Sequence, residues 1–306
     1  MHATRHPLPD ARWHFQHGPI DLVIGAEGEA GAVAAAHERA WQRFEPLLPE
    51  LVAELPALRQ PVGTHCPLQG PVARRMWQAC QPLAQQFITP MAAVAGAVAQ
   101  EIVAAYAVPG VRRAWVNNGG DIALHLQPGE RVRIGLYADL ARLDARQCVE
   151  GLQLDGQMAL AAEWPVRGVA TSGWRGRSHS LGIADSVTVL AATAAQADAA
   201  ATVIANAVDV AHAGIVRVPA CELRDDSDLG HRPVTVQVPP LPPDLLRQAL
   251  HQGLKKAEEL RASGLVWFAL LTCQQQAVST ARPPGVDALA HRPQPSAQNS
   301  VGSVFA

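Results

Sequence analysis

Residues 185–208, DSVTVLAATAAQADAAATVIANAV, decide the fold. The first part, SVTVLA, combines β-branched and apolar residues without a charge, which predicts a buried strand. Thr193 and Gln196 follow at the spacing of a capping box, and an alanine-rich helix is expected from there to Gly214. The alanines of this helix let neighbouring backbone come close.

Three polar residues interrupt the alanines of this helix. Asp198, Thr202 and Asn206 follow one another at intervals of four residues, and therefore lie on one helix face. A carboxylate and a hydroxyl one turn apart offer two oxygen ligands to a hard cation such as Mg²⁺, with water and a ligand phosphate to complete its coordination. Asp198 and Thr202 are thus candidate metal ligands. The alternative is a polar stripe that faces solvent.

Upstream of the strand and helix, the sequence is typical of antiparallel sheet. Residues 112–137 predict a meander of three strands, with turns at NNGG and PGE. In the middle strand, Ile122, Leu124 and Leu126 alternate with smaller or polar residues, as a sheet with one buried face requires. Further strands are expected in QCVEGLQLDG (147–156) and PVRGVATSG (165–173).

The turn between the first two strands of the meander is a candidate ligand site. Gly119 and Gly120 permit positive φ and let another group approach the backbone closely. The side chains of Asn117 and Asn118 can read the donors and acceptors of a small molecule, and Asp121 is a candidate for proton transfer. The alternative is a tight hairpin with Asx turns that binds nothing.

A second candidate segment is ATSGWRGRSHS, residues 170–180. Its hydroxyls, backbone amides and guanidinium groups suit a carboxylate or a phosphate, and its histidine can move a proton near neutral pH. The candidates for ligand binding are Thr171, Ser172, Gly173 and Arg177, and those for catalysis are Arg175 and His179. The alternative is an exposed, solvated loop.

Two other glycine-containing segments differ in what they predict. Gly70 and Pro71 lead into an expected helix over 72–80, whose first turn can carry an anion with help from Arg74 or Arg75. The segment GAEGEAG, residues 25–31, does not have the glycine spacing of a dinucleotide-binding fingerprint, and its two glutamates would repel a pyrophosphate.

The remaining elements mix strands with runs of helices. RWHFQHGPIDLVIGAEG (12–28) predicts a hairpin, and the helical pattern of residues 29–55 is interrupted at Pro46 and Pro49. Thr89 is expected to be the N-cap of a helix that begins at Pro90, and a helix over 243–264 leads into the strand LVWFALLT. This order favours an α+β fold over a doubly wound sheet. Residues 1–282 are expected to form one domain, and 283–306 a disordered tail.

Composition excludes several classes of protein. Hydrophobic residues make up 48% of the 306-residue chain and charged residues 17%, which indicates a globular protein. A net charge of −2 argues against nucleic-acid binding, and no segment is apolar enough for a membrane span. The five cysteines are widely spaced and odd in number, which favours free thiols in a reducing compartment over a disulfide framework. We therefore expect a cytoplasmic protein whose partner is a small anionic molecule.

Taken together and in order, three of these segments resemble the FAD:protein FMN transferase (ApbE) superfamily. They are WVNNGGDIALHL, GVATSG and the strand–helix segment at 186–208. The resemblance implies an ApbE-like, T-fold-like architecture of largely antiparallel sheet packed with helices. It also implies Mg²⁺ at Asp198 and Thr202, and a flavin-nucleotide site at 118–121 and 171–173. GPVARRM and SGWRGRSHSLGIADS are similar to an uncharacterised branch of that superfamily.

The sequence also departs from the superfamily pattern. The segment PMAAVAGA (90–97) has Ala92 and Ala93 where the transferases have glycines, and Gly96 where they have a lysine. The insert before the strand at 186 is far shorter, and His179 only approximates a histidine of the superfamily. These departures argue against FAD or FMN as the ligand. With Arg175 and Arg177 present, they favour a smaller anion.

The leading hypothesis is therefore an ApbE-like enzyme that acts on a small anionic metabolite or nucleotide in a cleft. The hairpin at 117–121, the loop at 170–180 and the alanine-rich helix would form that cleft. One alternative is an Mg²⁺-dependent FAD:protein FMN transferase. A second is a non-catalytic ligand-binding protein that keeps the fold, and assembly into a homo-oligomer is compatible with all three.

Overall fold

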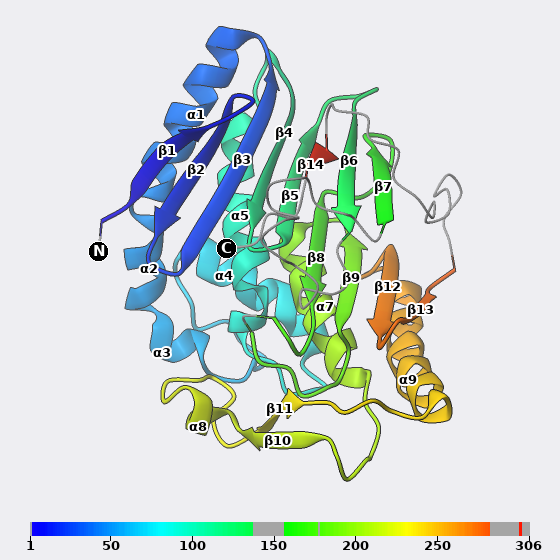
Figure 1. Cartoon of the computed structure of the whole chain (residues 1–306). Helices are drawn as coiled ribbons and strands as arrows, with labels where there is room; N and C mark the ends of the chain where they lie inside the picture. The colour runs from blue at the N-terminus through cyan, green and yellow to red at the C-terminus, as the bar shows by residue number, and fades with distance from the viewer. Residues whose placement is uncertain (1, 137–155, 177, 282–299, 302–306) are drawn as a thin grey trace.

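The computed structural model describes residues 2–136, 156–176, 178–281 and 300–301, and within them the main element is an antiparallel sheet of nine strands (Figure 1). The strands follow the order β1-β2-β3-β4-β5-β8-β9-β12-β13 across the sheet. Their bounds are β1 Thr4–Leu8, β2 Arg12–His17, β3 Ile20–Gly28, β4 Val111–Asn118, β5 Asp121–Leu126, β8 Gly168–Ser172, β9 Ser186–Ala191, β12 Phe268–Cys273 and β13 Gln276–Ser279. The expected hairpin at 12–28 is confirmed as β2 and β3.

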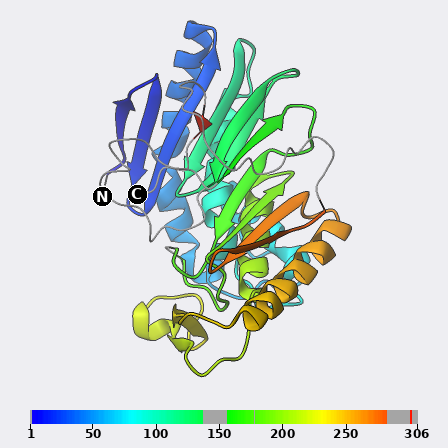
Figure 2. The same cartoon turned by 45° about the vertical axis from the view of Figure 1, so that its right-hand side comes forward.

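Helices cover one face of this sheet (Figures 1 and 2). They are α1 Ala30–Phe44, α2 Leu47–Ala53, α3 Leu55–Leu58, α4 Pro71–Cys80, α5 Val94–Val103, α7 Ala194–Ala207 and α9 Pro243–Ala262, with short 3₁₀ turns η1 Gln81–Leu83, η2 Pro90–Ala93 and η3 Ala104–Tyr106. The break expected at Pro46 is confirmed, because α1 ends at Phe44 and α2 begins at Leu47; the break expected at Pro49 is wrong, because Pro49 lies in the first turn of α2, where a proline is tolerated. Among the described residues, no helix has both the length and the apolar character needed to cross a membrane.

Helix α7 packs against β8 and β9. Its N-cap is confirmed: the Thr193 hydroxyl accepts a hydrogen bond of 3.2 Å from the Gln196 amide. Close approach depends on glycine, because a Cβ added to Gly168 would lie 2.2 Å from the Ala194 nitrogen. The helix ends at Ala207 rather than at Gly214, since the chain there turns away to bond with the segment before β9: the Ile183 amide donates to the Val208 carbonyl at 2.8 Å.

The other face of the sheet carries a separate apolar cluster, and a small second sheet contributes to it. That sheet has the order β14-β6-β7, with β6 Arg131–Leu136, β7 Gly156–Ala161 and β14 Ser300–Val301. The predicted three-stranded meander is therefore wrong in its last strand. Strand β5 has two edges, which pair with β4 and β8, so β6 crosses to the second sheet and pairs with β7. The alternation along β5 predicted a buried face, but not what covers it.

An arm of residues 216–237 extends below the main sheet in Figure 1. It consists of β10 Val216–Pro219, α8 Ala220–Leu223 and β11 Pro233–Gln237, with β10 and β11 paired. The arm is fastened to the body by an ion pair of 2.5 Å between Arg59 and Asp226, and by the Arg232 guanidinium 3.5 Å above the Phe87 ring centre.

Two expectations fall largely outside the described residues. The strand predicted at 147–156 is one of them, with only Gly156, the first residue of β7, described. The tail predicted from 283 is the other, and of it only Ser300 and Val301 are described; they pair in parallel with β6. The α+β class itself is confirmed by the mixed architecture of antiparallel sheet and helices.

Candidate carboxylate site

The turn at Gly119 and Gly120 has the predicted positive φ values, +64° and +110°. Asn117 and Asn118 before it point to opposite faces of the sheet, because successive strand residues alternate. The Asn117 side-chain oxygen accepts a 2.8 Å bond from the Gly120 amide, and so stabilises the turn. The Asn118 side-chain amide donates to the Ala95 carbonyl at 3.1 Å, which ties the turn to the start of α5 on the helix side.

Asp121 joins the turn to the end of β8. Its side chain is buried, and its Oδ1 accepts a 3.1 Å hydrogen bond from the Thr171 amide. Strand β5 begins at Asp121 and β8 ends at Ser172, so the two candidate ligand segments meet at one end of the sheet. The structure thus brings Asp121 together with Thr171.

Asp198 approaches the same end of the sheet from α7. Its Oδ2 accepts a 2.9 Å hydrogen bond from the Gly96 amide on α5. A Cβ added to Gly96 would lie 2.3 Å from the Ala194 carbonyl oxygen and 2.9 Å from the Asp198 Cβ. Position 96 therefore cannot carry the lysine that the transferase pattern has there, because α5 and α7 touch through this glycine.

The two carboxyl groups act on one another. Burial raises the pKa of Asp198 to about 7, even though backbone amides at residues 95 and 96 donate to it. Burial and the charge of Asp198 raise the pKa of Asp121 well above its ordinary value. Among the described residues, no lysine or arginine is among the groups that shift either pKa.

Thr202 lies on the same helix, one turn beyond Asp198, and is half-buried. Helix α7 runs alongside β8: Gly168, the first residue of β8, touches Thr193 at the helix start, and Gly182 approaches the helix near its end, where an added Cβ would meet the Ala205 carbonyl. Measured from Thr193, Thr202 lies roughly 14 Å along the helix, and measured from Gly168, Ser172 lies roughly 13 Å along β8. The two hydroxyls therefore stand at about the same level.

Asn206, the last residue of the polar stripe, has a structural role instead. Its Oδ1 accepts bonds from the Ser180 hydroxyl at 3.1 Å and the Leu181 amide at 2.9 Å. It therefore holds the loop after β8 against α7.

The basic loop lies on the other side of β8 from the turn. The Arg175 Nε is 4.0 Å from Asp185 Oδ1, and its guanidinium lies 4.8 Å from the centre of the Trp174 ring. Asp185 also accepts bonds from the Trp174 ring nitrogen at 3.3 Å and the Gln274 amide at 2.5 Å, so this group is anchored beside β9 and β12. His179 is half-buried in the same loop, and Arg177 falls outside the described residues.

The amides directly before α4, beside the candidate anion site of the sequence, are bound by the protein itself. The Glu54 carboxylate accepts bonds from the Gln69 and Gly70 amides at 2.6 and 2.7 Å. Arg75 is directed to the Glu101 carboxylate at 2.7 Å and the Ala97 carbonyl at 3.4 Å, while Arg74 is exposed on the helix. The structure does not bring this helix end or these arginines together with the carboxylate pair.

Sequence reasoning missed the contribution of residues 95 and 96, whose backbone groups bind Asn118 and Asp198. A glycine in an otherwise apolar helix was the available signal, since it marks close approach of two backbones. Within the described residues, no cluster of three or more His, Cys, Asp or Glu side chains is arranged to hold a metal. A cation here would therefore need hydroxyl, amide or substrate oxygens besides the two carboxylates.

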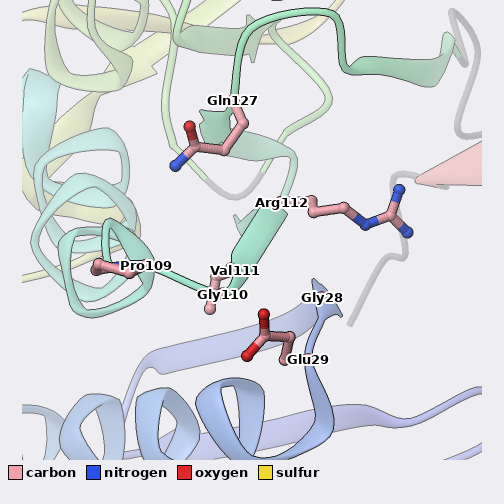
Figure 3. Close-up of a pocket in the computed structure, with 7 residues that line it drawn as sticks. All are labelled: Gly28, Glu29, Pro109, Gly110, Val111, Arg112 and Gln127. Atoms are coloured by element: carbon pink, nitrogen blue, oxygen red, sulfur yellow. The ribbon is translucent and has the colours of Figure 1, made fainter.

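A shallow hollow of about 540 Å³ lies at the opposite end of β4 (Figure 3). It is lined by Gly28, Glu29, Pro109, Gly110, Val111, Arg112 and Gln127. The hollow opens where β4 begins, whereas the turn of the carboxylate site follows its last residue, Asn118. Arg112 on its rim is exposed and pairs with Glu130 at 3.1 Å. None of the predicted site residues lines it.

An antiparallel sheet layered with helices, and a glycine turn beside a capped alanine helix, define an ApbE-like protein. The chain belongs to the family described as AbpE bacteria, whose model matches residues 5–280. It is similar to UPF0280 proteins from Methanosphaerula palustris, 34% identical over 64% of this chain and 77% of that protein, and from Methanopyrus kandleri, 35% identical over 67% and 78%. The apo structure of Pseudomonas stutzeri flavinyl transferase ApbE is similar with a TM-score of 0.40 and 14% identity, over 91% of this chain and 93% of that one.

Proposed function

We propose that this chain is an ApbE-like enzyme that binds a small anionic metabolite or nucleotide through a divalent cation at Asp198. The observation that carries the proposal is the pair formed by the buried Asp121 and the half-buried Asp198: the charge of Asp198 raises the pKa of Asp121, and among the described residues no arginine or lysine is among the charges that act on either group. Two carboxylates side by side in a buried site are unfavourable unless a proton or a cation compensates them.

The donor atoms fit a hard cation of the Mg²⁺ class. Asp198 offers a carboxylate oriented by the Gly96 amide, and Thr202 offers a hydroxyl one helical turn away. Mg²⁺ retains water and substrate oxygens in its shell, so few protein ligands suffice. When bound, such an ion supplies charge to a phosphate or carboxylate and polarises it.

Asp121 is the group we assign to proton transfer. Its Oδ1 is fixed by the Thr171 amide, and burial together with the charge of Asp198 raises its pKa, which favours the protonated carboxyl group that a proton donor needs. The amides and hydroxyls of Thr171, Ser172 and Gly173, with the turn at 117–120, would line the substrate. Arg175 follows two residues after Gly173 and is assigned to the substrate anion, with Arg177 and His179 as further candidates on the loop.

Thermal unfolding with added Mg²⁺ or Mn²⁺ tests the cation. We expect either ion to raise the Tm of the wild type and to leave the Tm of Asp198→Asn unchanged. At a hundredfold excess of the ion over its Kd, the free energy of unfolding of the wild type should rise by about 2.7 kcal/mol. The exposed Asp225 provides a matched control, since Asp225→Asn removes the same charge away from the site. A wild type whose Tm does not respond to divalent ions would contradict the proposal.

The substrate class is tested with nucleotides, small di-acids, FMN and FAD, each with and without Mg²⁺. We expect an anionic compound to stabilise the wild type further only when Mg²⁺ is present, and Arg175→Ala to lose that second increment. The same compounds are then assayed for turnover. Binding without any conversion would favour the non-catalytic alternative, and preferential stabilisation by FAD with flavin transfer would favour the transferase.

A further inference from the structure

Thr89 breaks the local rule that its position predicts. As the residue before Pro90 it was expected to cap the helix with its hydroxyl, but that side chain makes no capping bond. The hydroxyl instead donates to Asp228 Oδ2 at 2.5 Å, across a separation of 139 residues. Thr89 is 2% exposed, and Asp228 is half-buried in the arm. The Thr89 side chain thus bonds to a distant carboxylate instead of the local helix end, which departs from the local rule for this position.

The segment that begins at Thr89 leads straight to the carboxylate site. It continues through η2 into α5, where the Gly96 amide donates to Asp198 and the Ala95 carbonyl accepts from Asn118. Residues 89–96 are therefore held at both ends by carboxylates, one from the arm and one from α7. Any movement of this segment would move the amide that orients Asp198.

Cys80 lies against this segment, within the electrostatic influence of both carboxylates. Its thiol donates to the Thr89 carbonyl at 3.4 Å, so it lies directly beneath the segment. Burial raises the pKa of this thiol first, and the charges of Asp198 and Asp228 raise it further. Both carboxylates thus act on the same buried sulfur from the two ends of residues 89–96.

We propose that Asp228 is a positioning residue of the carboxylate site, which acts through Thr89 to fix the backbone amide that orients Asp198. The inference rests on the proposed function for its consequence, which is tighter binding of the cation. The structural part of the inference, that Asp228 fixes residues 89–96, does not depend on the proposed function, because the arm would hold these residues whether or not a cation is bound. The arm thereby contributes to the site without touching the bound ion.

The affinity of Mn²⁺ alone, measured by electron paramagnetic resonance, tests the consequence. Asp228→Ala and Thr89→Val each remove the bond, and we expect about tenfold weaker binding or more, as for other residues that orient metal ligands. Asp228→Asn keeps an acceptor and Thr89→Ser keeps the hydroxyl, so both should stay within about threefold of the wild type. An equal loss in Asp228→Asn and Asp228→Ala would overturn positioning in favour of a simple effect of charge.

Hydrogen exchange at the Gly96 amide, measured without metal, tests the structural content. We expect exchange at least about tenfold faster in Asp228→Ala and in Thr89→Val, because the amide loses its fixed partner more often. Arg232→Ala is the matched control, since it removes another anchor of the arm, over Phe87, and should leave Gly96 protected. Unchanged exchange at Gly96 in Asp228→Ala would overturn the inference.

The two measurements separate the two proposals. A wild type that does not bind Mn²⁺ would remove the proposed function, while the exchange data would still decide whether Asp228 positions Gly96. A wild type that binds Mn²⁺ with an affinity unchanged in Asp228→Ala and Thr89→Val would leave the function standing and remove the role of Asp228.

Discussion

Helix α5 packs beside two groups of buried acidic residues, and the protein treats them in opposite ways. At one end, Glu101 receives Arg43 Nε at 2.6 Å and Arg75 Nη1 at 2.7 Å. Burial alone would raise the pKa of Glu101, but the hydrogen bonds and charges of the two arginines outweigh it and lower the pKa. At the other end, Asp198 meets backbone amides and the neighbouring Asp121, and its pKa is raised.

The two acids differ in whether basic side chains balance their charge. Around Glu101 the charge is balanced within the fold, and Arg43 bonds in addition to both Glu50 oxygens, at 3.0 and 2.7 Å. Around Asp198, no lysine or arginine of the described residues is among the groups that shift its pKa. This contrast between two acids about a turn and a half of helix apart is what supports the proposed cation site at Asp198 rather than at Glu101.

Removing Glu101 gives the largest expected change in stability. Glu101→Ala leaves Arg75 without its carboxylate partner in a largely buried setting, so we expect a loss of about 3 kcal/mol in the free energy of unfolding. Urea titration followed by circular dichroism measures it. Glu50→Ala is the matched control, since Glu50 is 40% exposed and its loss should cost well under about 1 kcal/mol. Equal losses in the two variants would remove the contrast between the ends of α5.

The pH dependence of stability is the next largest effect. The pKa of Asp198 in the folded state is about 7, against an ordinary value of 3.8, so between these values the folded protein binds more protons than the unfolded chain. This contribution is therefore complete below about pH 4 and is lost as the pH rises through about 7, by about 2 kcal/mol after allowance for the partial exposure of Asp198.

Unfolding curves in EDTA at several pH values check this dependence. Asp198→Asn should flatten the slope between about pH 4 and pH 7, because the amide does not titrate. Mg²⁺ should restore stability mainly at the alkaline end, where the carboxylate is ionised and free to bind it. A slope that is the same in Asp198→Asn and in the wild type would show that another group is responsible.

The contrast between the two ends of α5 also explains which parts of the site were predictable. The strand–helix segment, the cap at Thr193 and the turn at Gly119 depend on neighbours a few residues away, so the sequence predicted them correctly. Placing 117–121, 171–173 and 198 together required the family resemblance, because periodicity shows which face a residue is on but not which element it meets.

What remained hidden depends on partners far along the chain. Glu54 binds the amides directly before α4, and Asp228 accepts a hydrogen bond from the hydroxyl of Thr89, over separations of 16 and 139 residues. Gly96 donates to Asp198 across 102 residues. Polar pairs of this kind leave no period in the sequence, and each competes with a local rule that the sequence does show, such as an anion site or an N-cap.

The smallest expected effect is the loss of stability in Thr193→Ala, which tests whether fraying of α7 contributes to the pH dependence attributed to Asp198. Thr193→Ala removes the bond from the Gln196 amide at the helix start, and we expect a loss of about 1 kcal/mol in the free energy of unfolding. Asp198 lies more than a turn beyond the cap and is held by Gly96, so its environment should not change. Unfolding curves of Thr193→Ala should therefore be displaced by the same amount at every pH and keep the wild-type slope. A slope that flattens together with the loss of stability would mean that fraying of α7, rather than the buried pair, produces the pH dependence.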